Sequence, residues 1–414
     1  MKVLQVNNYN YLKGGSEKVY QETIKILLAN NHDLRYFSSF NFKNDNICLG
    51  VNVNVKHWSD ASSFLSKITS AINFIYNRSV AKQLDKFIKE FKPDVAHLHI
   101  YYGLLSNSII KVLRKNNIPI VQSVHEYRLL CPAYTLLDSK NRVCERCAKK
   151  KIKIDCIKKG CIKNSKILSF LAVFENMIRD LLFNNQKKID AFIMVSQFIN
   201  DKHIQYYPKL GSKSFQIYNS VDIDYYKKFI VNINLKEDYY LYFGRLSHEK
   251  GLTTLFRVFE KNQNLKLKVA GTGPIEKELN DFVEQNNISN IEFLGFVKGE
   301  PLYELISKAK FTIVPSEWYE NNPLSVIESL VLGTPVIGAN IGGIPEIIID
   351  NFNGFIHESG SVDSLNNSIE KSYNLSLDEY SIICENSKSN AHEIFNNDSY
   401  YKKLIKVYEK VIGE

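Results

Sequence analysis

Residues 311–339 read FTIVPSEWYENNPLSVIESLVLGTPVIGA, and this stretch decides the fold class. Its apolar ends, residues 311–314 and 336–338, predict two buried strands. Between them, Asn322 is suited to cap a helix, Pro323 to its first position and Gly333 to its end, so we expect a helix over residues 323–332. A strand, a helix and a second strand in this order predict a parallel sheet that is covered by helices.

The same alternation extends through the rest of the chain. Apolar runs predict further strands at residues 2–6, 35–38, 95–100, 118–124, 191–195, 239–243, 265–270 and 291–294. Helical spacing is found at residues 17–30, 74–91, 104–116, 167–183, 251–261, 274–284 and 301–309. The sequence therefore predicts an α/β protein of two Rossmann-like, doubly wound domains that face each other across a cleft. We expect these domains at residues 1–210 and 211–396, with the polar region 208–238 as a hinge.

The last segment, residues 397–414, contains a helix with apolar residues at Leu404, Val407 and Val411. Such a helix needs an apolar surface to cover. Its spacing does not indicate which domain supplies that surface, and packing back on the N-terminal domain is one of the alternatives.

Two glutamates lie around the start of the helix predicted at residues 323–332. A helix that begins at the carboxyl end of a strand offers free N–H groups and the positive end of its dipole, which favour a phosphate. Glu320 precedes this helix, and Glu328 lies about 9 Å along its axis from Asn322. Carboxylates accept hydrogen bonds from sugar hydroxyls, so the pair favours a sugar-phosphate site. The alternative is two solvated surface charges, which the apolar neighbours of Glu328 argue against.

A basic pair follows the strand predicted at residues 239–243. Arg245 and Lys250 would emerge at the carboxyl edge of the sheet, where they would stabilise the negative charge that grows on a departing diphosphate. Basic pairs in loops are more often simply solvated, but this position favours a ligand site.

Two other loops after strands carry candidate residues. Gly14 and Gly15 follow the first strand and let the backbone approach a ligand closely. His125 follows the strand predicted at residues 118–124. The alternative for His125 is a loop histidine whose hydrogen bonds are satisfied locally, and the alternative for the glycines is an ordinary turn.

The chain resembles the retaining GT-B glycosyltransferases of glycosyltransferase family 4 over nearly its whole length. The segments that carry the likeness are the E-x7-E motif at 320–328, Gly333–Val336, Gly244-Arg245, Lys250-Gly251, Gly14–Glu17, Asn219–Asp222 and Gly342–Glu346. By this resemblance, Arg245 and Lys250 hold the diphosphate of a nucleotide-sugar donor, and Glu328 its ribose. Glu320 contacts the transferred sugar, and His125 lies near the reacting centre. The other donor-binding residues that the resemblance implies are Gly14, Gly15, Asn322 and Leu324.

The resemblance implies that a hexosyl group moves from a UDP- or GDP-sugar to a glycan acceptor with retention at the anomeric carbon. The acceptor hydroxyl then attacks on the face of the leaving group, and the chemistry needs no metal and no cofactor. Asn321-Asn322-Pro323 replaces the glycine-phenylalanine-glycine that is common after the first glutamate, so the donor sugar is not carried over. Glu126 and Ser220 stand where aspartate and glycine are usual.

The positive charge of the chain is local. The formal net charge is +9, from 53 basic and 44 acidic residues, but residues 140–166 hold eleven basic and two acidic residues. We expect this segment to attract an acceptor carried on a polyprenyl diphosphate, or the anionic inner leaflet of a membrane. The helix at residues 167–183 would add a shallow apolar contact through Phe170, Phe174, Ile178 and Leu182. A stripe of this kind is more often domain core.

Five of the seven cysteines lie in or beside the basic segment. Cys144-x2-Cys147-x8-Cys156-x4-Cys161, with Cys131 upstream, resembles the spacing of a structural zinc loop. By resemblance to similar inserts in the family, the expected ligands are Cys131, Cys144, Cys147 and Cys161, with Cys156 as a substitute. Free thiols and disulfides are the alternatives.

Two other functions remain open. A nucleotide-sugar epimerase would share the fold, and a basic zinc loop also occurs in nucleic-acid-binding proteins. The E-x7-E motif argues against the first, and the absence of interleaved aromatic residues argues against the second, so we expect no nucleic-acid partner.

No signal peptide or long apolar segment is found, so we expect a cytoplasmic protein, peripheral on the cytoplasmic face of the membrane.

Overall fold

A computed structural model describes residues 1–45, 47–55 and 64–413 of the chain. The chain forms two compact units. The first unit consists of Met1–Ser139, Cys144–Ser220 and Asp398–Glu414, and the second of Lys140–Val143 and Val221–Asn397. Each unit contains a parallel sheet with helices packed on it, so the predicted class of two Rossmann-like α/β domains is confirmed.

The first unit is built on a seven-stranded parallel sheet with the order β3-β2-β1-β4-β5-β6-β7. Its strands are β1 (Lys2–Val6), β2 (Asp33–Ser39), β3 (Gly50–Val53), β4 (Val95–Leu98), β5 (Ile120–Val124), β6 (Ala191–Met194) and β7 (Ser214–Gln216). The central strands β4, β5 and β6 are buried along their whole length. Helices cover both faces of such a sheet, which is why these strands read as apolar runs in the sequence.

Nine α-helices begin or end in the first unit, within the described residues. They are α1 (Gly15–Ala29), α2 (Phe64–Ile75), α3 (Arg78–Phe91), α4 (Ser108–Lys115), α5 (Ile154–Lys159), α6 (Lys166–Ile178), α7 (Asn185–Lys188), α8 (Gln197–Tyr206) and α16 (Asn397–Ile412). The helix predicted at residues 74–91 is in fact two helices. The side chain of Asn77 accepts hydrogen bonds from the backbone N–H groups of Ser79 and Val80, which starts α3 and separates it from α2.

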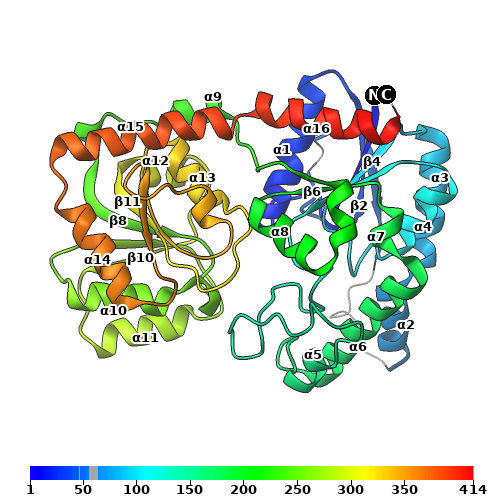
Figure 1. Cartoon of the computed structure of the whole chain (residues 1–414), viewed down its shortest axis with the longest axis horizontal. Coiled ribbons are helices and arrows are strands. Elements are labelled where there is room, and N and C mark those ends of the chain that lie inside the picture. The colour runs from blue at the N-terminus through cyan, green and yellow to red at the C-terminus, as the bar shows by residue number, and fades with distance from the viewer. Residues whose placement is uncertain (46, 56–63, 414) are drawn as a thin grey trace. The chain divides into compact units, whose positions relative to one another are not determined.

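The C-terminal helix α16 packs in the first unit, next to α1 (Figure 1). Its buried side chains join a cluster that includes residues of α1 and of the sheet, and they are Tyr400, Leu404, Val407 and Tyr408. The hydroxyl of Tyr400 lies 2.9 Å from the hydroxyl of Thr23 on α1. The helix α16 is therefore part of the same core as the strand β1.

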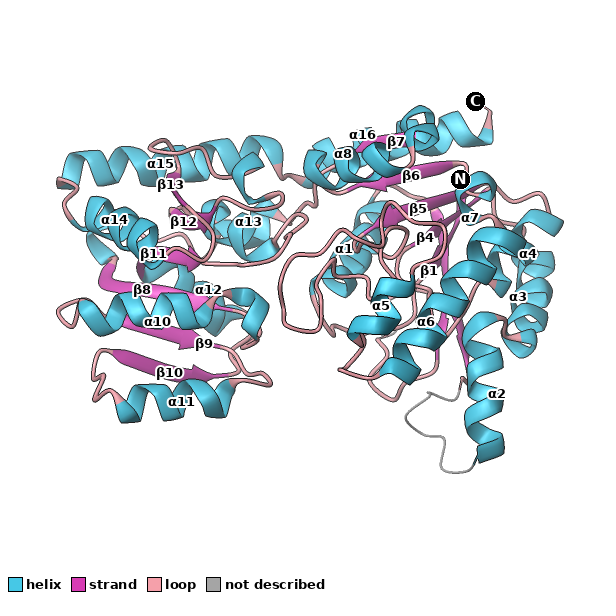
Figure 2. Ribbon diagram, turned by 60° about the horizontal axis from the view of Figure 1, so that its bottom comes forward, coloured by secondary structure: helices cyan, strands magenta, loops and turns pink. Residues whose placement is uncertain are grey.

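The second unit is built on a six-stranded parallel sheet with the order β10-β9-β8-β11-β12-β13 (Figure 2). Its strands are β8 (Glu237–Phe243), β9 (Leu267–Ala270), β10 (Ile291–Gly295), β11 (Ala309–Val314), β12 (Val336–Ala339) and β13 (Gly354–His357). Its helices are α9 (Ile223–Lys227), α10 (Leu252–Lys261), α11 (Glu276–Gln285), α12 (Glu300–Lys308), α13 (Leu324–Val331), α14 (Val362–Tyr373) and α15 (Leu377–Ile394).

Several elements lie where the sequence predicted none. The region 208–238 is not irregular throughout, because it contains β7 and α9, which are too short to show a full apolar period. The helices α14 and α15 were missed because several of their buried positions are serines, namely Ser368, Ser372 and Ser387. The predicted N-cap at Asn322 was wrong by one residue. Pro323 has an extended ψ of 120°, so α13 begins at Leu324.

Strand order reverses at one place in each sheet. In the first sheet the reversal lies between β1 and β4, and in the second between β8 and β11. The two strands at each reversal are followed by loops that lead to opposite faces of the sheet. A crevice forms between these loops at the carboxyl edge, where ligands of this fold class bind. A functional site in either unit is therefore expected among these loops.

Leu404→Ala tests the packing of α16. Leu404 is fully buried, so we expect the truncation to lower the free energy of unfolding by about 3 kcal/mol, through lost burial and the cavity that remains. Urea denaturation measures this loss. Leu377→Ala at an exposed site on α15 is the control, and equal midpoints for the two variants would contradict the packing of α16.

Candidate functional site

An ion pair lies at the reversal point of the second sheet. Lys250 follows β8 and Glu320 follows β11, and the ammonium of Lys250 donates to the Glu320 carboxylate at 2.6 Å. The hydroxyl of Ser316 donates to the same carboxylate oxygen at 2.8 Å. Burial alone would raise the pKa of Glu320, but the charge and hydrogen bond of Lys250 outweigh it and hold the pKa below its ordinary value. Glu320 is therefore ionised at neutral pH.

The backbone of Glu320 is fixed by the loop after β12. The N–H of Gly343 donates to the carbonyl oxygen of Glu320 at 2.7 Å. Gly342 has a φ of +64°, and a Cβ atom there would lie 2.2 Å from the same oxygen. Only glycine allows this approach, so Gly342, which begins the segment Gly342–Glu346 named above for its likeness to the family, sets the position of Glu320.

The second glutamate, Glu328, lies on α13 and is only 5% exposed. Its carboxylate and the neighbouring ring of Tyr303 are in contact with the hydroxyl of Tyr226, and burial together with Glu328 raises the pKa of that phenol. Tyr226 lies on the short helix α9. Neither Glu320 nor Glu328 is thus a solvated surface charge. The sequence carried no signal for Tyr226, because α9 was not predicted.

The other predicted donor-binding residues of the second unit surround the same sheet edge. Arg245 is exposed in the loop after β8, where the hydroxyl of Tyr242 donates to its carbonyl oxygen at 2.8 Å. Asn322 is buried before α13, and Leu324 is the first residue of that helix. The ammonium of Lys250 lies 5.3 Å from the centre of the Trp318 ring. The structure thus brings the candidates of the second unit to one reversal point.

Gly14, Gly15 and His125 lie in the first unit, also at the carboxyl edge of its sheet. Gly14 precedes α1, Gly15 is its first residue, and both are exposed. His125 directly follows β5, and its Nε2 lies 3.0 Å from Nδ1 of His99, which follows β4. Burial lowers the pKa of His125 to about 4, so the imidazole is neutral at neutral pH.

The sequence did not single out His99 or His97. Both lie in the segment 95–100, whose alternation predicted a strand. Residues two apart on a strand point to the same face, so the same alternation also places both rings on one side of the sheet. The pattern therefore carried a signal for this pair of histidines as well as for the strand.

The basic insertion follows His125, and one of its lysines, Lys153, is buried in the interior of the insertion. Lys153 is 1% exposed, and its ammonium donates to the carbonyl oxygens of Leu129 at 3.2 Å and Leu130 at 3.0 Å. Burial lowers the pKa of Lys153 to about 8. Lys159 is also engaged, because its ammonium lies 2.9 Å from the Asp138 carboxylate. These two lysines hold the insertion together.

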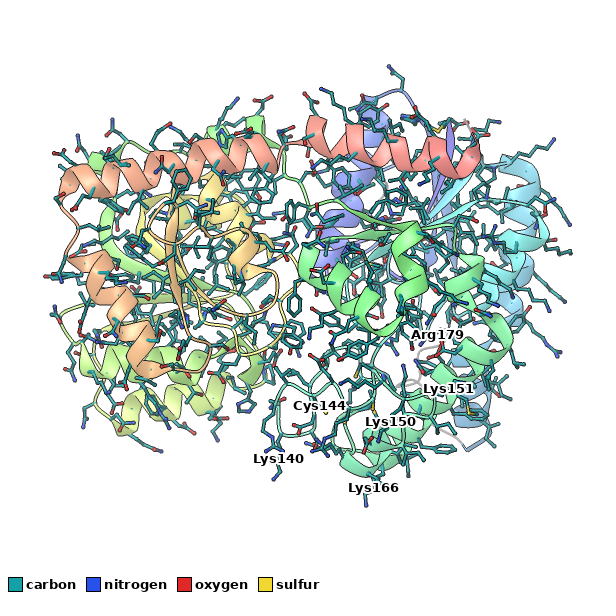
Figure 3. The ribbon with its side chains drawn as sticks, viewed as in Figure 1. Lys140, Cys144, Lys150, Lys151, Lys166 and Arg179 are labelled. Carbon is teal, nitrogen blue, oxygen red and sulfur yellow. The ribbon has the colours of Figure 1, made fainter. Side chains whose placement is uncertain are left out.

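Nine other basic residues of the insertion are exposed. They are Lys140, Arg142, Arg146, Lys149, Lys150, Lys151, Lys158, Lys163 and Lys166. Figure 3 shows Lys140 and Lys166 pointing outward from the ribbon at the border of the insertion. The surface charge predicted from the sequence is thus reduced by the burial of Lys153 and by the pairing of Lys159 with Asp138, but it remains strongly positive.

The apolar stripe of α6 is not domain core. Of the predicted stripe, Phe170 is 57% exposed, Phe174 is exposed and Ile178 is half-buried, and Leu182, which follows α6, is exposed. The buried residues of α6 are Ser169, Ala172, Val173, Glu175 and Asn176, most of them small or polar. The alternative that this stripe is domain core, which is the more common case, is therefore wrong for α6. Within the described residues, no helix has the length and apolar content needed to span a bilayer.

The cysteines of the insertion do not form the predicted set of four. Cys144 lies apart, with the ammonium of Lys159 3.8 Å from its sulfur. Cys156 lies beside Cys161, because a hydrogen bond with its thiol lowers the pKa of Cys161 to about 7. Together with this hydrogen bond, Cys131 and Cys147 in turn raise the pKa of Cys156. Among the described residues, no group of three or more His, Cys, Asp or Glu side chains is placed to hold a metal ion. A zinc site in this loop stays a prediction.

Two family models match adjoining parts of the chain. Residues 13–225 match the family described as Glycosyltransferase Family 4, and residues 226–391 match Glycosyl transferases group 1. An uncharacterized 42.6 kDa protein in the cps region of Klebsiella pneumoniae is 24% identical, over 99% of this chain and 100% of its own. An uncharacterized glycosyltransferase of Methanocaldococcus jannaschii is 30% identical, over 43% of this chain and 46% of its own.

Solved structures share the fold. A glycosyltransferase from Rickettsia africae superposes with a TM-score of 0.72 at 16% identity, covering 99% of this chain and 98% of its own. Anabaena HepE, solved in complex with UDP and glucose, superposes with a TM-score of 0.67 at 17% identity, covering 98% of both chains. At these identities the likeness is evidence for the fold alone.

Gly342→Ala tests the contact that positions Glu320. Because the added Cβ would meet the Glu320 carbonyl oxygen, we expect faster amide exchange at Gly343 and a lower urea midpoint. Gly299→Ala is the matched control, since Gly299 has a φ of +66° but no atom within 4 Å of the point where a Cβ would lie. The control loses stability only through its backbone, by about 1–3 kcal/mol, because φ +66° with ψ −146° is a conformation that residues other than glycine rarely adopt. Equal losses in both variants would show that the close approach does not matter.

Proposed function

The chain belongs to glycosyltransferase family 4, and on this premise we propose that it transfers a hexosyl group from a UDP- or GDP-sugar to a lipid-linked glycan during the assembly of a surface polysaccharide. The observation that carries the proposal is the ion pair of Lys250 and Glu320 at the reversal point of the second sheet. The neighbourhood of the Klebsiella relative, in a cps region, supports the polysaccharide assignment. The UDP and glucose held by Anabaena HepE support a UDP-sugar donor.

The charges of the second unit suit a nucleotide diphosphate. The side chain of Lys250 is 25% exposed, so its ammonium reaches solvent while Glu320 holds it in place. Arg245 adds an exposed guanidinium from the same loop. In the proposed reaction, these two cations stabilise the negative charge that the diphosphate gains as its bond to the sugar breaks. Positive charge from side chains then serves where other enzymes use a divalent ion.

The two glutamates suit the sugars of the donor. Glu320 is ionised and accepts hydrogen bonds, so it binds hydroxyl groups of the transferred sugar. Glu328 has the same capacity toward the ribose, and the hydroxyl of Tyr226 orients its carboxylate. Glu320 is held by Lys250 and Ser316 and Glu328 by Tyr226, which limits the motion of both carboxylates when the donor binds.

The proposed reaction retains the configuration of the anomeric carbon. The acceptor hydroxyl forms the new bond on the face from which the diphosphate departs, and a diphosphate oxygen takes the hydroxyl proton. The products are the extended glycan and the nucleoside diphosphate. His125 lies near the reacting sugar as a neutral imidazole and contributes a hydrogen bond rather than a charge.

The insertion suits an anionic membrane. Its exposed basic residues from Arg146 to Lys166 and the exposed apolar residues of α6, which together we call the basic-apolar surface, combine charge attraction with shallow burial in the headgroup region. Each Lys or Arg near an anionic bilayer contributes about 1 kcal/mol. We therefore propose that the enzyme works on the cytoplasmic face of the membrane, where a polyprenyl diphosphate acceptor is anchored.

Lys250→Met tests the donor site. We expect UDP-sugar or GDP-sugar to raise the melting temperature of the wild type and to undergo slow hydrolysis. The variant loses both, with turnover lower by about 100-fold, because one charge on the diphosphate is missing. Lys298→Met, at an exposed site in the same unit, keeps wild-type values. Normal turnover in Lys250→Met would contradict the assignment, and an isomerised sugar formed from the donor alone would indicate an epimerase.

Neutralising Lys149, Lys151 and Lys163 to glutamine tests membrane docking. On vesicles of phosphatidylcholine with about 30% phosphatidylglycerol, we expect binding to fall about 100-fold, because three contributions of about 1 kcal/mol are lost. Sedimentation with the vesicles measures binding. Glutamine at the exposed Lys402, Lys403 and Lys406 of α16 is the matched control and leaves binding unchanged. Equal binding of both triple variants would remove the support for this surface.

A further inference from the structure

A continuous series of buried hydrogen bonds leads from His125 to the C-terminal helix. Nε2 of His125 lies 3.0 Å from Nδ1 of His99, and Nε2 of His99 lies 3.2 Å from Oε1 of Gln5. Nε2 of Gln5 lies 3.4 Å from the hydroxyl of Tyr408 and also 3.4 Å from Nδ1 of His97, and that hydroxyl lies 2.7 Å from the same Nδ1. Gln5, His97, His99 and Tyr408 are all fully buried. All of these residues belong to the first unit.

The three imidazoles of this series are neutral. Burial lowers the pKa of His97 to about 3, that of His125 to about 4, and that of His99 well below its ordinary value. A neutral imidazole has one N–H donor and one acceptor nitrogen. The partner of one ring nitrogen therefore determines what the other nitrogen does.

The amide of Gln5 sets the direction of the series. Its carbonyl oxygen accepts from Nε2–H of His99, so Nδ1 of His99 carries the lone pair. That lone pair accepts from Nε2–H of His125, which leaves the lone pair of His125 on Nδ1. The tautomer of His125 is thus linked to Gln5 through one intervening ring.

The other end of the series agrees with this direction. The amide nitrogen of Gln5 donates to the hydroxyl of Tyr408, and that hydroxyl donates to Nδ1 of His97. His97 then has its proton on Nε2, and it donates to the hydroxyl of Ser123 at 2.8 Å. Each donor meets an acceptor, and reversing the Gln5 amide would reverse every bond in the series.

We infer that Gln5, His99 and Tyr408 are positioning residues that hold His125 as the Nε2–H tautomer, the form in which its ring meets the sugar of the proposed reaction. The second half of this inference rests on the proposed function, because it needs a sugar beside His125. The first half does not, since it concerns only the buried series. The arrangement also gives α16 a role at the site, because the hydroxyl of Tyr408 is one of the two partners of the Gln5 amide nitrogen and also bonds the other, Nδ1 of His97.

The experiment compares two tyrosines of α16 that are both buried and both hydrogen-bonded. Tyr408→Phe removes the hydroxyl between Gln5 and His97, whereas Tyr400→Phe removes the one that contacts Thr23. Nitrogen-15 NMR of the histidine rings reads the tautomer of His125 directly. The buried ring of His203, whose Nδ1 lies 2.7 Å from the Ile199 carbonyl oxygen, is the internal reference.

We expect wild-type His125 to show Nε2–H, and Tyr408→Phe and Gln5→Met to show a mixture of tautomers with kcat about 10-fold lower and an unchanged KM for the donor. Gln5→Glu restores the acceptor for His99 and rescues the tautomer. Tyr400→Phe keeps both the tautomer and kcat. A proton on Nδ1 in the wild type, or an unchanged tautomer in both Gln5→Met and Tyr408→Phe, overturns the inference whether or not the protein transfers sugar. A changed tautomer with unchanged kcat overturns the role toward the sugar and leaves the donor site of the second unit unaffected.

Discussion

The loops at the carboxyl edge of the second sheet touch one another through their backbones, and the candidate site depends on this close approach. A Cβ atom at Gly251 would lie 1.9 Å from the carbonyl oxygen of Pro315, and one at Gly271 would lie 1.8 Å from that of Gly244. With the contact of Gly342 on Glu320, these glycines join the loops after β9, β8, β11 and β12 in the order of the strands. Lys250 and Glu320 come from two of these loops, so the geometry of their ion pair is set by backbone packing and not by the side chains alone.

Lysine side chains that donate to backbone carbonyl oxygens fix further segments of the chain. Lys153 in the insertion and Lys236 in the second unit each direct an ammonium at carbonyl oxygens, which are Leu129 and Leu130 in the first case and Ser307 and Ala309 in the second. A buried cation is costly unless it is fully hydrogen-bonded, so these contacts fix the chain segments that supply the carbonyls. The exposed lysines of the insertion, all within the described residues, include Lys150, whose ammonium lies 2.7 Å from the Asp155 carboxylate, and none of them donates to carbonyl oxygens from the interior as Lys153 does.

The sequence predicted the fold class and the family because both depend on patterns that repeat: apolar strands, capped helices and motifs at fixed spacing. It did not predict which way the stripe of α6 faces, since apolar spacing is the same on a buried and an exposed helix. Nor did it distinguish Lys153 from its exposed neighbours, because burial of one lysine in a basic run leaves no mark on composition. Tyr226 and the partners of His125 also escaped prediction. Their contacts join residues far apart in the chain, and only the folded topology brings these together.

The position of α16 has a consequence for the order in which the protein is made. The chain leaves the first unit near Ser220 and returns to it at Asp398, and these two segments run close together, because the N–H of Val221 donates to the carbonyl oxygen of Phe395 at 2.9 Å. On the ribosome, most of the first unit is synthesised before the second, yet its core lacks Leu404 and Tyr408 until α16 emerges. The second unit is therefore free to complete its core earlier, whereas the first unit completes its core only after the whole of the second has been made.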